Sequence, residues 1–145
     1  MYDVETSSFS IKTKGNASIT DITGHVQSIL SSSGFSEGNA LIFVSGSTAG
    51  ITTIEYETGL LKDYPSFFEK IVPSNQKYHH DDTWHDGNGH AHVRASLQGA
   101  SFTVPFSRKS LLLGTWQQIV LIDFDNCPRQ REIIVQLSGN KENEK

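Results

Sequence analysis

The sequence of 145 residues contains one cysteine and no long apolar run. Cys127 cannot form a disulfide within the chain, which is typical of a protein from a reducing compartment. No segment reaches the ~20 consecutive apolar residues that a membrane-spanning helix needs. The start, MYDVETSSFS, also lacks the apolar core of a signal peptide. We therefore expect a cytoplasmic protein without a membrane segment.

An excess of positive charge is also absent. Twelve lysines and arginines stand against 16 aspartates and glutamates, which gives a formal net charge of −4. This balance argues against nucleic acid or an anionic membrane surface as the main partner. The partner that we expect instead is a small molecule.

What the sequence does contain is typical of a single globular domain. Hydrophobic residues make up 36% of the chain and charged residues 19%, and no repeat or linker divides it. We expect the domain to span residues 1–139. The polar segment NKENEK, residues 140–145, is expected to be a C-terminal tail.

The hydrophobic pattern predicts helices early in the chain and strands late. A stripe from Ile22 to Leu30 predicts a helix that Thr20 or Asp21 caps and Gly34 ends, and a second helix is expected over Leu60–Val72. Strands are expected within residues 6–14, 39–56 (two strands), 100–106, 110–125 and 131–139. Together these elements predict a single-domain α+β fold with an antiparallel sheet or β-sandwich and two to three helices.

The stretch WQQIVLIDF, residues 116–124, shows little alternation between apolar and polar residues. A strand with one solvent-exposed face alternates apolar and polar residues, so this strand is expected to be central or to lie at a subunit contact. Its apolar residues exceed what one small sheet needs to cover, which favours an oligomer.

A histidine-rich segment, HHDDTWHDGNGHAH (residues 79–92), holds five of the six histidines. Histidine and aspartate are common metal ligands. On an extended backbone His90 and His92 would project from one face, as a shared metal ion requires. On a helix they would diverge, and Asp86 with His90, or Asn88 with His92, would share a face instead.

Each of these two backbone conformations brings one pair of possible metal ligands together. His80 or His85 could supply the third ligand, because two glycines in the segment permit a tight bend. We predict that His80, His90 and His92 converge on one divalent cation. The alternative is a solvated polar loop, which suits His79 and Asp82 best.

Other known signatures are missing. The chain has no H-E-x-x-H and no pair of cysteines, no glutamate closely follows H-x-H, and GSTAGIT lacks the G-K-[ST] ending of a phosphate-binding loop. Composition and spacing alone therefore indicate a small His/Asp cluster beside a basic residue.

Four stretches resemble the YjbQ-like proteins, which are often called secondary thiamine-phosphate synthases. They are TAGITTIE, KYHHDD, HAHVRASLQGASFTVPF and LLLGTWQQIVLIDFD, and the likeness runs in order over about residues 2–138. The resemblance implies a compact, jelly-roll-like β-sandwich, a homotrimer, and thiamine-phosphate synthase activity.

The resemblance also implies roles for individual residues. The catalytic residues that it implies are Glu55, His80, Asp81 and Arg94, and the metal ligands are His80, His90 and His92. The substrate-binding residues that it implies are Thr48, Ser96, Trp116 and Gln117. For Trp116 a place in the core is the alternative, and for Arg94 a surface ion pair is the alternative to a phosphate clamp.

The implied reaction joins a hydroxymethylpyrimidine pyrophosphate to a thiazole phosphate and expels pyrophosphate. A divalent cation and a basic contact would have to stabilise the leaving group. Imidazole ligands favour zinc, whereas pyrophosphate chemistry usually uses magnesium with oxygen ligands. Two alternatives therefore stay open: a metal-assisted hydrolase of a small phosphorylated or acyl compound, and a non-catalytic metal- or ligand-binding trimer.

Overall fold

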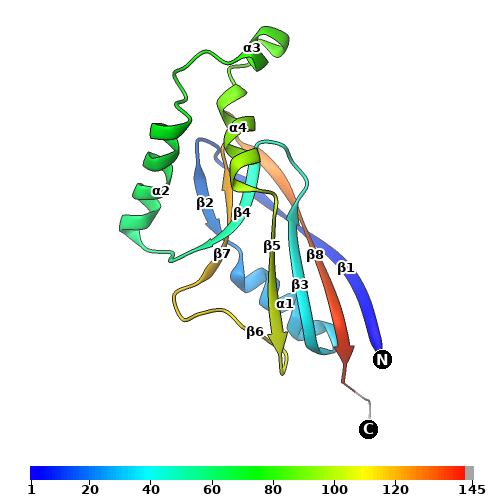
Figure 1. Ribbon diagram of the computed structural model, residues 1–145. Helices are drawn as coiled ribbons and strands as arrows, with labels where there is room; N and C mark the ends of the chain where they lie inside the picture. Colours follow the sequence, from blue (N-terminus) through cyan, green and yellow to red (C-terminus); the bar gives the residue numbers. More distant parts are fainter. Residues whose placement is uncertain (143–145) are drawn as a thin grey trace.

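The computed structural model describes residues 1–142, which form two antiparallel sheets and four helices (Figure 1). The larger sheet has the strand order β1 (Tyr2–Thr13), β8 (Arg129–Lys141), β3 (Phe35–Val44), β5 (Ser101–Ser107) and β6 (Ser110–Leu111). The smaller sheet has the order β2 (Ser18–Asp21), β7 (Gln118–Asp123) and β4 (Ala49–Ile54). The helices are α1 (Thr23–Ser33), α2 (Thr58–Ile71), α3 (His79–Trp84) and α4 (Gly89–Gln98).

The expected α+β class is confirmed, but the number of helices is not. The sequence pattern predicted two to three helices, and the structure adds a fourth because the histidine-rich segment folds into α3 and α4. Strand β2 was not expected either. It contains Thr20 and Asp21, the two residues that were expected to cap the first helix.

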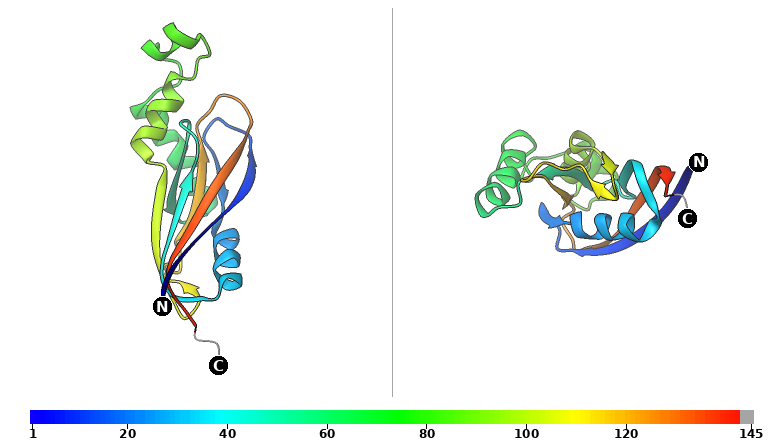
Figure 2. Two further views of the ribbon diagram at one scale, coloured as in Figure 1. Left: turned by 90° about the vertical axis from the view of Figure 1, so that its right-hand side faces the viewer. Right: turned by 90° about the horizontal axis from the view of Figure 1, so that it is seen from below.

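The molecule is elongated, with its helices unevenly placed. Helices α2, α3 and α4 gather at one end, while both chain ends lie at the other, beside β1 and β8 (Figures 1 and 2). Strands β1 and β7 end, and β8 begins, toward the end with the three helices. The polar residues at these strand ends are therefore brought near the histidine-rich segment.

Strand β7 is the central strand of the smaller sheet and is buried on both faces. Ile119 and Leu121 belong to the main core, which also contains α1 and the larger sheet. Val120 and Ile122 belong to a second core against α2 and α4. This double burial explains the missing alternation and confirms a central strand. It also removes the reason to expect a subunit contact there, because the chain itself covers these residues.

The first helix agrees with its prediction in its apolar stripe and its C-terminal end, but its N-cap is Ile22 rather than Thr20 or Asp21. It begins at Thr23, whose N–H donates to the Asp21 carboxylate at 3.0 Å, and it ends at Gly34 in the left-handed conformation with φ 84°. Val26 and Leu30 point into the core. The second helix starts two residues earlier than expected and contains Pro65 within it.

The boundary of the expected tail also shifts. Strand β8 continues to Lys141, because Asn140 pairs with Tyr2 and Lys141 pairs with Phe35. Residues 143–145 of the expected tail lie outside the described residues. Within residues 1–142 no helix has the length and apolar character that crossing a membrane requires.

Strands β3 and β8 approach closely where Gly38 pairs with Gly139. Both glycines have positive φ angles, 153° and 154°, and a Cβ at either one would overlap a backbone carbonyl oxygen of the opposite strand. We predict that Gly38→Ala lowers the free energy of unfolding by about 3 kcal/mol or more, which urea titration would measure. Gly24→Ala is the control, because its Cβ meets nothing within 4 Å, and it should be neutral or stabilising. Equal effects of the two substitutions would contradict the prediction.

Candidate metal centre and adjoining polar pocket

The histidine-rich segment forms two short helices joined by a tight bend. His85 and Gly87 adopt left-handed conformations with φ 53° and 67°. Gly89, the first residue of α4, lies so close to Tyr78 that a Cβ would overlap that side chain. A glycine is therefore required where α4 packs against the start of α3. The expected bend is present, but its flanks are helical rather than extended.

His80 and His92 lie together even though α4 is a helix. Their ring centroids are 4.2 Å apart. The Nδ1 atom of His80 lies 3.9 Å from an Asp81 oxygen and 3.7 Å from an Asp86 oxygen. One donor atom from each of His80, Asp81 and Asp86 lies within 4.8 Å of the others. Donor atoms around a tetrahedral zinc ion, at bond lengths of ~2.1 Å, are about 3.4 Å apart. These spacings are close to that arrangement.

Both carboxylates of this cluster are oriented by backbone groups. An Asp81 oxygen accepts a hydrogen bond from Gly89 N–H at 3.2 Å, and an Asp86 oxygen accepts one from Asn88 N–H, also at 3.2 Å. The Nδ1 atom of His80 is buried and makes no hydrogen bond within residues 1–142. A buried imidazole nitrogen that faces two fixed carboxylates, too far away for hydrogen bonds, is an arrangement that could hold a cation.

The imidazole of His92 is held in the form that binds metals. Burial lowers the pKa of His92, and the nearby His80 lowers it further, against the opposing effect of Asp86 and Asp125. A lowered pKa keeps the imidazole neutral at pH 7, and metal ligation requires the neutral form.

His90 does not join His80 and His92 as predicted. Because α4 is helical, residues two apart diverge by about 200°, so His90 faces a different side from His92. It is buried beside Tyr78, with ring centroids 6.5 Å apart. His79 is fully exposed, as expected for a residue assigned to solvent.

The Arg94 side chain is used for packing and does not reach into the pocket that adjoins the cluster. Its guanidinium is buried, and its Nε and Nη2 atoms donate to the carbonyl of Val72 at 2.9 and 2.8 Å. Nη2 also contacts the Glu69 carboxylate at 2.7 Å. This corrects the expectation of a phosphate clamp, because these bonds hold the end of α2 against α4.

A polar pocket of about 310 Å³ adjoins the cluster. Asp86 belongs to both the pocket and the cluster, and His92, whose ring lies beside that of His80, also lines the pocket, so a ligand in the pocket would lie beside a cation held by the cluster. The remaining lining residues are Gly46, Ser47, Thr48, Asn88, Asp125, Arg129 and Arg131.

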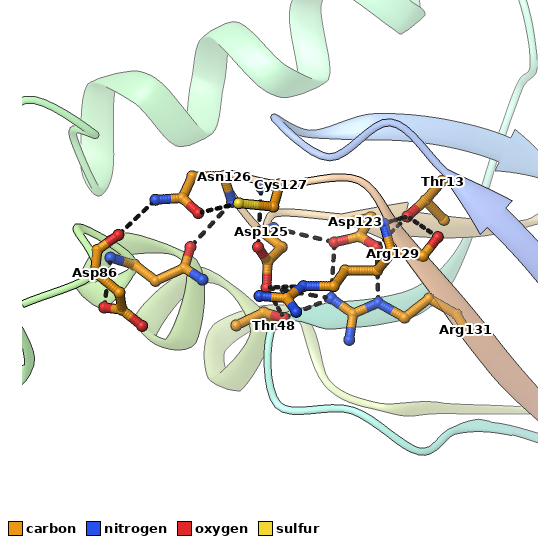
Figure 3. Close-up of polar contacts among 10 residues, drawn as sticks. Thr13, Thr48, Asp86, Asp123, Asp125, Asn126, Cys127, Arg129 and Arg131 are labelled. Carbon is orange, nitrogen blue, oxygen red and sulfur yellow. Dashed lines mark hydrogen bonds and ion pairs between the residues drawn. The ribbon is translucent and has the colours of Figure 1, made fainter. Parts of the chain in front are cut away.

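The floor of this pocket is a buried network of ion pairs (Figure 3). Arg131 donates from Nε and Nη2 to the two oxygens of Asp123, at 2.7 and 2.9 Å. Arg131 Nη2 also donates to the Thr48 hydroxyl, which in turn donates to Asp125 at 2.9 Å. Thr13 donates its hydroxyl to Asp123 at 2.6 Å. The network joins β1, β7, β8 and the residue before β4.

Asp125 carries its charge in this buried setting. Burial alone would raise the pKa of Asp125, but hydrogen bonds from Asn88, Thr48, the backbone N–H of Cys127 and Arg129 together lower it below its usual value. Arg129 Nε lies 3.2 Å from an Asp125 oxygen, and the Arg129 side chain is half exposed. Asp125 therefore remains an anion paired with Arg129.

A second cavity of about 270 Å³ shares Gly46, Ser47 and His92 with the polar pocket. Ser96 lines this second cavity, and its hydroxyl donates to the His92 carbonyl at 2.9 Å. The predicted residues Thr48 and Ser96 therefore both lie close to the histidine cluster.

Glu55, Trp116 and Gln117 lie elsewhere. Glu55 follows the opposite end of β4 from Thr48 and lines a separate pocket of about 330 Å³ with Trp116. Trp116 is 71% exposed, so it is not a core residue. Gln117 accepts from Gly114 N–H at 2.9 Å and closes its own turn. Within one chain these three residues do not belong to the cluster.

Sequence reasoning missed the charged residues that form the floor of the pocket. Asp123 and Asp125 are two apart at the end of β7, and Arg129 and Arg131 are two apart at the start of β8. An acidic pair at the end of one strand and a basic pair at the start of the next could have indicated this network from the sequence. Side chains two residues apart share a face of a strand, so the two pairs can meet.

Comparison with known proteins assigns the family. A family model described as UPF0047 protein YjbQ-like matches residues 7–140. This chain belongs to the YjbQ family. A UPF0047 protein of Archaeoglobus fulgidus is 39% identical, over 86% of this chain and 94% of that protein. Protein YugU of Bacillus subtilis is 36% identical, over 89% of this chain and 96% of that protein.

Solved structures of YjbQ-like proteins share the fold. A YbjQ-like protein of unknown function from Sulfolobus solfataricus has a TM-score of 0.90 and 32% identity, over 97% of this chain and all of that one. An uncharacterised YjbQ/UPF0047 family protein from Clostridium acetobutylicum has a TM-score of 0.82 and 35% identity, over 90% of this chain and 98% of that one.

These comparisons overturn the predicted function. The YjbQ family model carries an uncharacterised-family description, the curated relatives are named only as UPF0047 proteins, and the Sulfolobus structure is described as one of unknown function. None of them supports thiamine-phosphate synthesis. The expectation of a thiamine-phosphate synthase is therefore wrong.

The contact between Glu69 and Arg94 predicts a dependence of stability on pH. Hydrogen bonds from the Ser74 backbone and from Arg94 lower the pKa of Glu69 to about 2. Its stabilising contribution is therefore present above the ordinary value of 4.5 and is lost as the pH falls toward 2. We predict that Glu69→Gln lowers the free energy of unfolding by about 1 kcal/mol at pH 7, the scale of a half-exposed charged hydrogen bond.

The difference between Glu69→Gln and the parent should shrink in urea titrations at pH 4.5 and again at pH 3. The control is Glu132→Gln, which changes an exposed carboxylate on β8. A difference that stays constant from pH 7 to pH 3 would contradict the assigned role of Glu69.

Proposed function

We propose that this YjbQ-family protein binds a divalent cation through His80, Asp81, Asp86 and His92. The observation that carries the proposal is the buried Nδ1 atom of His80, which has no hydrogen-bond partner within residues 1–142 and faces two carboxylates at 3.7 and 3.9 Å. The backbone bonds from Gly89 and Asn88 fix those carboxylates in place. Ligands fixed in advance favour binding, because little ordering is needed when the ion arrives.

The donor set favours zinc over magnesium. Two imidazoles and two carboxylates suit zinc, whereas magnesium prefers an all-oxygen shell that includes several waters. Asp86 and His92 line the polar pocket, so the cation would be open to a ligand on that side. Because the four side chains would fill a tetrahedral shell, a molecule in the pocket would reach the ion as a fifth donor, an expansion that catalytic zinc sites can make. The proposal therefore includes metal-assisted chemistry on a small molecule held in the pocket.

Zinc titration by isothermal calorimetry tests the metal centre. We predict that the parent binds one zinc ion per chain and that His80→Ala and His92→Ala each weaken zinc binding at least about 100-fold. Loss of an outer hydrogen-bonding partner already costs 10–100-fold, and these substitutions remove a direct ligand.

His79→Ala is the matched control, because His79 is adjacent to His80 but fully exposed. His79→Ala should bind zinc as tightly as the parent does. The metal centre is rejected if the His80→Ala and His79→Ala proteins bind zinc equally well. Preference for magnesium over zinc in the same titrations would overturn the assignment of the ion.

We also propose that the protein assembles as a homotrimer. Helices α2 and α4 each expose two apolar side chains spaced by four residues, which places each pair on one face of its helix: Phe67 with Ile71, and Val93 with Leu97. Their exposed fractions run from 45% to 60%, so each face is open to contact with another copy, and the number of three copies comes from the family resemblance.

Light scattering should give three times the 16.0 kDa mass of one chain. We predict that Leu97→Glu shifts the protein toward the monomer because a charge would be buried in the contact. Leu112→Glu, at a similarly exposed position outside both helices, should leave the mass unchanged. A monomer mass for the parent at micromolar concentration contradicts the proposal.

A further inference from the structure

Arg131 has one unused edge, and it borders the polar pocket. Its Nε and Nη2 atoms are bound to Asp123 and Thr48, while Nη1 makes no hydrogen bond within residues 1–142 (Figure 3). The side chain is nine-tenths buried, and a Cβ added at Gly46 would lie 2.7 Å from Nη1. Nη1 therefore faces Gly46 across the pocket lining. A guanidinium nitrogen without a protein acceptor at a cavity wall can donate to a ligand in that cavity.

Further donors border the same space. The N–H groups of Gly46 and Ser47 make no hydrogen bond among the described residues, and both residues line the pocket. Arg129 lines it as well, and its half-exposed side chain contacts Asp125 through Nε at 3.2 Å. Guanidinium and backbone N–H donors together are a common arrangement for binding oxyanions.

The charges of the surrounding residues make this binding dependent on the cation. Arg129 and Arg131 are balanced by Asp125 and Asp123, with which they pair. The charge around the pocket is then set by the two carboxylates of the cluster, Asp81 and Asp86. Without a cation these repel an anion, and a bound divalent ion cancels their charge.

We propose that the pocket binds an oxyanion of the phosphate class, held jointly by the cation and by the Nη1 edge of Arg131. This inference rests on the proposed metal centre and adds the ligand class that the centre takes. The Nε and Nη2 atoms of Arg131 already donate to both carboxylate oxygens of Asp123. The pocket therefore offers single donors from separate residues. Such a set suits a tetrahedral oxyanion better than a planar carboxylate, for which a bidentate arginine is the usual partner.

Joint binding must be reciprocal. If bound zinc raises the affinity for phosphate by some factor, phosphate raises the affinity for zinc by the same factor. We expect a factor of at least about ten, within the usual range for coupled sites. Calorimetric titration of inorganic phosphate into zinc-free protein, and into zinc-loaded protein cleared of excess metal, measures it. Acetate, titrated in the same way, should bind more weakly than phosphate.

Two variants test the residues. Gly46→Ala places a methyl group against Nη1 and should weaken phosphate binding to the zinc-loaded protein about tenfold or more, without changing the affinity for zinc alone. Gly24→Ala, whose methyl group meets nothing within 4 Å, is the control. Arg129→Gln should likewise weaken phosphate binding, whereas Arg108→Gln, at an exposed position in the β5–β6 turn, should not.

The outcomes separate the two proposals. Absence of zinc binding, with or without phosphate, overturns the metal centre. Normal zinc binding, combined with phosphate affinity that is unaffected by zinc or by Gly46→Ala, overturns the oxyanion site alone. Acetate that binds as tightly as phosphate overturns the assignment of the ligand class.

Discussion

The ion pair between Asp123 and Arg131 is the interaction on which the geometry of the pocket depends. Asp123 ends β7 in the smaller sheet and is completely buried, and Arg131 lies near the start of β8 in the larger sheet. Two hydrogen bonds join them, and Thr13 and Thr48 bind the same pair. Buried charges are tolerated when every partner is in place, so the ends of the two sheets are fixed relative to each other. The same pairing leaves Nη1 of Arg131 at the pocket wall.

The histidine cluster is fastened to this junction through two asparagines. The Asn88 side-chain oxygen accepts from Asn126 N–H at 3.0 Å, and the Asn126 side chain donates to the Asp86 carbonyl at 2.7 Å. The bend between α3 and α4 is thereby tied to the loop between β7 and β8. Side chains on these two short helices therefore gain a fixed position from the buried network beside them.

The sequence pattern predicted what depends on local periodicity. The α+β class, the strand β7 and the C-terminal limit of α1 follow from hydrophobic spacing and from the turn residue Gly34, and the structure confirms them. The proximity of His80 and His92 was also predicted, but with an extended backbone, whereas α4 is helical. Whether a short polar segment is helical depends on its packing, here of Ala91 and Ala95 against the second core. Spacing alone does not contain that information.

The roles of the arginines were still less predictable, because they depend on which acceptors the fold places next to each guanidinium. Arg94 saturates a helix end, while Arg131 keeps one donor free. The same limit applies to Glu55, which the family resemblance linked to the histidines. The length of β4 separates Glu55 from Thr48 by roughly 20 Å, at ~3.3 Å per residue. One chain therefore cannot bring Glu55 to the cluster, so a shared role would require a neighbouring copy, and the proposed trimer is the arrangement that could provide it.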